Sequence, residues 1–123
     1  MHVTVITVDQ DGTSHFADRE IDLVARAYAP PAPPLEVSDP VPAARGMFFR
    51  MPSGWFGDWH PSPRHQYFVQ TTGLLDVQVG DGEVRRLGPG TVVLLEDTHG
   101  PGHTTRVVGP DAVCGVFLHL PDE

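Results

Sequence analysis

Short runs of alternating apolar and polar residues, each closed by a glycine turn, fill the second half of this chain. The clearest run covers residues 74–79, where every second residue is leucine or valine (Leu75, Val77 and Val79). Side chains two apart on a strand point to the same face, so this run predicts a half-buried strand. Gly80-Asp81-Gly82 and Gly88-Pro89-Gly90 follow it as turns. Short strands at this spacing predict an all-β barrel or sandwich.

The same pattern predicts further strands along the chain. Residues 91–96 are apolar on both faces until their end, which indicates a strand that runs through a buried position. Residues 14–24 fit neither the strand nor the helix period well, and we expect an extended segment there. The other expected strands cover residues 2–8, 46–51, 83–87, 103–108 and 113–120.

Residues 29–42 contain six of the 13 prolines of the chain. Proline cannot donate to a strand ladder or sit inside a helix, so this segment should be extended and partly polyproline in form. We expect it to wrap around the barrel surface; the alternative is a proline-motif ligand for another protein.

Length and charge bound the class of protein. A chain of 123 residues suggests a single domain, 1–123. The net charge of −8 disfavours binding to nucleic acid and to anionic membrane surfaces. No apolar stretch is long enough to span a membrane, and the N-terminus lacks the pattern of a secretory signal. The one cysteine cannot form an internal disulfide, so a cytoplasmic location is expected.

Two stretches rich in histidine carry the candidate chemistry. Residues 59–73 read WHPSPRHQYFVQTTG, and residues 88–103 read GPGTVVLLEDTHGPGH. If the first stretch is one extended strand, a set of polar residues shares one face with Phe68, whereas His65 lies on the other. That set could build a polar pocket; it comprises His60, Ser62, Arg64 and Gln66.

These two stretches resemble the paired motifs of the cupin superfamily, small double-stranded β-helix (jelly-roll) barrels. The first family motif has the pattern H-x-H-x3-E-x6-G, and the residues at its positions here are His60, Ser62, Gln66 and Gly73. The second motif supplies a histidine after a glycine turn and an apolar strand, which matches Gly90, residues 92–95 and His103. The resemblance implies a barrel over residues 45–120, preceded by N-terminal strands and the proline-rich crossing in 1–44.

The resemblance also implies a metal site, because His60, Gln66 and His103 stand at family ligand positions. Zinc, iron, nickel or manganese would be the candidate metals. Ser62 replaces the usual second histidine, and Gln66 replaces the usual glutamate. The alternative is a hydrogen-bonded polar network without metal, since imidazole and amide groups satisfy each other well. His119, near the end of the chain, is expected at the surface or an interface.

Other residues are candidates for the pocket. Glu96 ends an apolar strand, so it could serve as a general acid or base at the rim of the pocket, or pair with an arginine. Large aromatic side chains near the first motif could form the pocket wall or plug one end of the barrel; they are Trp55, Phe56, Trp59 and Phe68.

The chain contains no P-loop, dinucleotide fingerprint, nucleophile elbow or C-x-x-C motif. We therefore expect a small-molecule enzyme that acts on an apolar or aromatic substrate by proton transfer: isomerisation, cyclisation or elimination. His60, Gln66, Glu96 and His103 are its candidate catalytic residues. The alternatives are a non-catalytic binding module and a structural scaffold. A homodimer is expected, because exposed strand edges favour pairing.

Overall fold

The computed structural model describes residues 1–121, which form strands and no helix. In that range there is accordingly no helix that could cross a membrane. The strands are β1 (His2–Val8), β2 (Ser14–Glu20), β3 (Val24–Arg26), β4 (Leu35–Val37), β5 (Arg45–Met51), β6 (Phe56–His60), β7 (Gln66–Gln70), β8 (Leu74–Gln78), β9 (Val84–Leu87), β10 (Val92–Leu95), β11 (His103–Val108) and β12 (Val113–His119).

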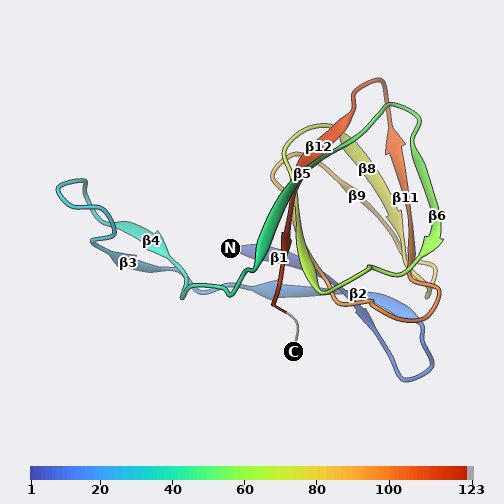
Figure 1. Cartoon of the computed structure of the whole chain (residues 1–123), viewed down its shortest axis with the longest axis horizontal. Helices are drawn as coiled ribbons and strands as arrows, with labels where there is room; N and C mark the ends of the chain where they lie inside the picture. Colours follow the sequence, from blue (N-terminus) through green and yellow to red (C-terminus); the bar gives the residue numbers. More distant parts are fainter. Residues whose placement is uncertain (122–123) are drawn as a thin grey trace.

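Two sheets face each other and form the barrel (Figure 1). The larger sheet has the order β2-β1-β10-β7-β12-β5, and the smaller has the order β6-β11-β8-β9. β1 pairs in parallel with β10, and the other neighbours in both sheets are antiparallel. The prediction of an all-β jelly-roll barrel is confirmed. The barrel also begins earlier than residue 45, because β1 lies inside the larger sheet.

The hydrophobic core lies between the two sheets. Leu75, Val77 and Val79 are buried in it, as the alternation in residues 74–79 predicts. Strand β10 is buried on both faces: Val93 and Leu95 enter this core, and Leu94 packs with a second apolar cluster on the outer side of the larger sheet. The prediction that residues 91–96 run through a buried position is confirmed.

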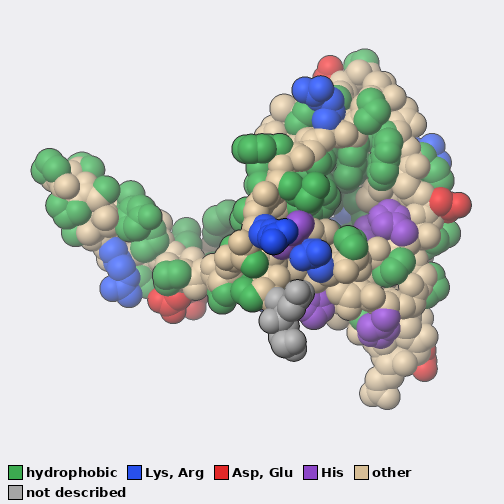
Figure 2. All heavy atoms as spheres, viewed as in Figure 1, with side chains coloured by type: hydrophobic (Ala, Val, Ile, Leu, Met, Phe, Trp, Pro, Cys, Tyr) green, Lys and Arg blue, Asp and Glu red, His purple; other side chains and the backbone are tan. Residues whose placement is uncertain are grey.

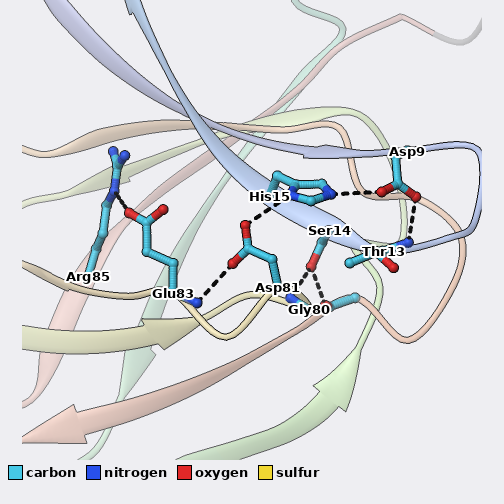
Figure 3. A network of polar contacts seen from close by, with 9 residues as sticks. Asp9, Thr13, Ser14, His15, Gly80, Asp81, Glu83 and Arg85 are labelled. Carbon is cyan, nitrogen blue, oxygen red and sulfur yellow. Dashed lines mark hydrogen bonds and ion pairs between the residues drawn. The ribbon is translucent and has the colours of Figure 1, made fainter.

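Ser14, at the start of β2, ties three chain segments together at one end of the barrel. Its buried hydroxyl donates to the carbonyl oxygen of Gly102 and accepts from the amide of Gly80, both at 2.7 Å. Beside it, the ring of His15 lies between the carboxylates of Asp9 and Asp81 (Figure 3). The loop between β10 and β11, which ends at Gly102, is therefore anchored to the hairpin turns β1–β2 and β8–β9.

Two expectations about the chain path fail. Residues 59–73 are not one strand: β6 ends at His60, β7 begins at Gln66, and the two strands belong to different sheets. Pro61 and Pro63 lie in the break, where proline cannot donate to a ladder. The proline-rich segment does not wrap around its own barrel either. It supplies the turn and the second strand of the exposed hairpin β3–β4, which lies at the end of an arm that projects away from the barrel (Figure 1).

Candidate functional site

A cavity of about 390 Å³ lies between the two sheets. Its walls are mostly apolar and come from both sheets, including Phe68, Leu75, Val93 and Phe117. Figure 2 shows hydrophobic side chains gathered around this hollow, with histidines near its rim. The polar side chains of its lining are Thr105 and, grouped around the ends of β6, β7, β11 and β12, His60, Ser62, Arg64, Gln66, His103 and His119. Several residues of the hydrophobic core thus also line the cavity.

The two sheets contribute different pairs of residues to the polar end. His60 and His103 are register neighbours on β6 and β11, and their ring centroids are 4.8 Å apart. Gln66 and His119 are register neighbours on β7 and β12 in the larger sheet. His60, Gln66 and His103 therefore line one cavity from facing sheets, although His60 and Gln66 do not share a strand.

His103 forms the shortest side-chain contact of the site. Its Nδ1 lies 2.5 Å from Oδ2 of Asp97, and the two residues are 5% and 0% exposed. A carboxylate accepts hydrogen bonds, so Nδ1 carries the proton and Nε2 remains for the cavity. Gly102, with φ of +76°, allows the backbone of His60 to pass close to the start of β11, because a Cβ at Gly102 would collide with the carbonyl oxygen of His60.

His60 is oriented in the same sense as His103. Its Nδ1 lies 2.6 Å from the carbonyl oxygen of Asp58. A carbonyl oxygen can only accept, so Nδ1 again carries the proton and Nε2 is the remaining acceptor. Both imidazoles, when neutral, thus offer a lone pair on Nε2 as a possible base.

Ser62 has a structural role at the polar end. Its hydroxyl donates to the carbonyl oxygen of Arg64 at 2.7 Å and accepts from Nε2 of Gln66 at 3.3 Å. Its backbone amide donates to the carbonyl oxygen of Asp97 at 2.9 Å. These contacts hold the 61–65 loop against the residue that orients His103.

Two residues of the site were missed in the sequence. Asp97, rather than Glu96, is the carboxylate that meets a histidine, and Glu96 does not line the cavity. The period-two pattern contains this signal, since Val93 and Leu95 point inward and Asp97 continues their face. His119 likewise continues the inward face of Phe117, but its place near the end of the chain suggested a surface residue.

The four aromatic candidates divide into two groups. Trp55 and Phe68 line the cavity. Phe56 and Trp59 do not line it, and each is 45% exposed. The guanidinium of Arg106 lies 4.5 Å from the ring centroid of Phe56, so this ring serves a surface cation–π contact. The expectation that all four form the pocket wall fails because Phe56 and Trp59 face outward on their strand.

The donor set falls short of what a catalytic metal usually takes. Across residues 1–121, no group of three or more histidine, cysteine, aspartate or glutamate side chains lies close enough to hold a metal ion. His60 and His103 supply two imidazoles, Gln66 as the third implied ligand offers only a neutral amide oxygen, and Asp97 is engaged with His103. A catalytic zinc site commonly has three protein ligands. The residues present do not fit such a centre, and we derive no chemical step through a metal.

Comparison with known proteins agrees with the architecture. No family model matches the sequence, and no curated protein matches it either. Among solved structures, the cupin domain of Schizosaccharomyces pombe Cnp3 superimposes with a TM-score of 0.54 at 15% identity, over 98% of this chain and 88% of that one. At this identity the likeness shows the fold alone. The protein is a cupin-fold β-barrel with an internal cavity.

Proposed function

We propose that the protein is a small-molecule enzyme that moves a proton on an apolar or aromatic substrate held in the cavity. The observation that carries the proposal is the buried pair His103–Asp97 at the polar end of an otherwise apolar cavity. A histidine whose tautomer is fixed by a buried carboxylate is suited to act as a general base. His60, 4.8 Å away between ring centroids, is the second proton carrier.

The proposed step balances without any redox partner. Nε2 of His103 accepts a proton from a substrate carbon, and the electron pair of the broken C–H bond moves onto the conjugated substrate. Asp97 acts as a positioning residue and stabilises the imidazolium that forms. His103 then returns this proton to another substrate atom in an isomerisation, or to the departing leaving group in an elimination, and so regains its neutral form.

The second candidate is a barrel that binds a small ligand without turnover. It is supported by the fact that Ser62, Gln66 and Asp97 are all engaged in contacts within the protein. This engagement leaves few groups for chemistry. The two candidates differ in one observable, because a binding module does not accelerate the breaking of a C–H bond.

The test is hydrogen–deuterium exchange of enolisable aryl ketones and aryl 2-oxo acids in D₂O, followed by proton NMR. We expect the protein to accelerate exchange over buffer, and His103→Gln to reduce the acceleration by about 10²-fold or more. His65→Gln is the matched control, because His65 is exposed and does not line the cavity. Ligand binding without any accelerated exchange across the panel supports the second candidate and contradicts the first.

A further inference from the structure

The polar end of the cavity contains hydrogen-bond donors and a fixed positive charge, in addition to the two basic imidazoles. We infer that the ligand of this cavity carries a carboxylate, which Arg64 and His119 bind while His60 and His103 face the rest of the molecule. The inference rests on the proposed function, and it names the chemical class of the substrate: an apolar or aromatic carboxylic acid.

The charge of the lining is opposite to that of the chain. The chain has 16 acidic and 8 basic residues. The cavity is nevertheless lined by one arginine and three histidines, and among the residues that the structure describes no aspartate or glutamate lines it. A cavity with positive charge and low-dielectric walls concentrates anions near its mouth.

Arg64 is available to a ligand. It lies in the loop between β6 and β7, and its carbonyl oxygen accepts from the hydroxyl of Ser62 at 2.7 Å, which fixes the backbone. Within residues 1–121, no carboxylate lies within ion-pair distance of its guanidinium, whereas Arg85 and Arg86 are both paired with acids. A guanidinium matches the two oxygens of a carboxylate in a bidentate geometry.

His119 offers a donor on the larger sheet. Its Nδ1 is buried and has no hydrogen-bond partner within the described part of the chain. An unpartnered N–H in that position is less favourable than an unpartnered lone pair. The proton is therefore expected on Nε2, the ring nitrogen left to donate to a ligand oxygen. The register partner of His119 is Gln66, so this donor lies opposite His60 and His103 across the two sheets.

The two sides of the polar end thus have complementary roles. The larger sheet and the 61–65 loop supply Nε2–H of His119 and the guanidinium of Arg64, which bind oxygen. The smaller sheet supplies the Nε2 lone pairs of His60 and His103, which accept protons. A carboxylate on the donor side places the adjacent carbon of the acid near the bases, and the remaining body enters the apolar part of the cavity.

The test uses two ligands of nearly equal size, 1-naphthoate and the neutral 1-naphthalenemethanol, with binding measured by calorimetry. We expect the acid to bind about tenfold more tightly or better, as one charge-assisted hydrogen bond allows. Arg64→Gln and His119→Phe should each remove much of that preference and leave the affinity for the alcohol unchanged. His65→Gln should leave both affinities unchanged.

The outcomes separate this inference from the proposed function. If acid and alcohol bind equally, or if Arg64→Gln and His119→Phe leave the preference intact, the carboxylate site is wrong while the ligand cavity stands. If neither ligand binds, the cavity does not hold an aromatic acid of this size and the inference fails, whereas the proposed function stands or falls with the hydrogen–deuterium exchange panel. Loss of alcohol binding in Arg64→Gln or His119→Phe would indicate that the substitution damaged the cavity. The conservative variant Arg64→Lys, which keeps the positive charge, then decides: it must show the preference for the acid over the alcohol.

Discussion

Oδ2 of Asp97 and Nδ1 of His103 lie 2.5 Å apart at the inner end of the β10–β11 loop, in a place that solvent does not reach. This contact fixes which nitrogen of His103 holds the proton. An amide in place of the carboxylate can donate to Nδ1 and favour the opposite tautomer, in which Nε2 can no longer accept a proton.

The first prediction follows from this contact. Asp97→Asn should reduce the acceleration of hydrogen–deuterium exchange by about 10²-fold or more, as expected when a general base is lost. The affinity for naphthoate should change little, because the cavity keeps its shape. Exchange kinetics and calorimetry on the same preparation check both parts. A variant with full exchange activity would mean that Asp97 does not set the protonation of His103.

The second prediction concerns the pH dependence of stability at His15. Hydrogen bonds to Asp9 and then Asp81 raise the pKa of His15 above 6.5, and the hydrogen bond from His15 lowers the pKa of Asp9 below 3.8. The stabilisation from charged His15 is thus fully present below pH 6.5 and is lost as the pH rises through the higher folded-state pKa. The contribution of Asp9 is present above pH 3.8 and is lost as the pH falls through its lowered folded-state pKa.

Thermal unfolding from about pH 5 to about pH 9 tests whether the contacts of His15 with Asp9 and Asp81 stabilise the fold in this pH-dependent way. We expect the melting temperature of the wild type to exceed that of His15→Gln at low pH, and the difference to shrink as the pH rises. Both carboxylates are exposed, so added salt should weaken the effect. A difference that is constant across this range would show that His15 does not titrate against Asp9 and Asp81.

The third prediction concerns Ser14. Ser14→Ala leaves the amide of Gly80 and the carbonyl of Gly102 without their hydroxyl partner in a buried place. The free energy of unfolding should fall by about 1–3 kcal/mol. Chemical denaturation measures this loss, with Ser53→Ala as the exposed control. An unchanged denaturation midpoint would mean that water replaces the hydroxyl at both groups.

The fourth prediction concerns metal. Within residues 1–121 no third histidine, cysteine, aspartate or glutamate lies close enough to join His60 and His103 around a metal ion, so we expect purified protein to contain far less than one zinc, iron, nickel or manganese ion per chain. A chelator should leave hydrogen–deuterium exchange unchanged. Elemental analysis gives the answer directly, and a stoichiometric metal that disappears in His60→Ala would restore the metal site implied by the cupin resemblance.

The fifth prediction is a homodimer. Phe48 is 88% exposed on β5, which is an edge strand of the larger sheet. Val24, Tyr28 and Leu35 on the projecting arm are also exposed. Apolar surface at a free sheet edge favours association with a second copy. Light scattering at micromolar concentration should give twice the monomer mass of 13.4 kDa, and Phe48→Ser should shift it toward the monomer. A monomer mass for the wild type contradicts this expectation.

Much of the inward-facing surface could be predicted from alternation alone. Leu75, Val77 and Val79 are buried as expected, and His60, Gln66 and His103 all line the cavity. Asp97 and His119 follow from the same rule once Leu95 and Phe117 are known to point inward. Glu96 and Trp59 lie on the outward face that alternation assigns to them, next to the inward-facing Leu95 and His60. Phe56 differs, because an even spacing from His60 would place it inward, and it faces outward because the pairing of β6 with β11 shifts register between His103 and Thr105.

The sequence by itself determined which segments are strands and, within each strand, which side chains share a face, because both are local properties of an extended backbone. Only the tertiary structure decided that His60 lies beside His103 on one sheet while Gln66 lies beside His119 on the other. That choice depends on how β6, β7, β11 and β12 pair, and strand pairing is a long-range matter of loop closure and packing between residues far apart in the chain. The contact between Asp97 and His103 is local by comparison: the two residues are six positions apart, and the β10–β11 loop folds back so that a buried carboxylate and an imidazole satisfy each other.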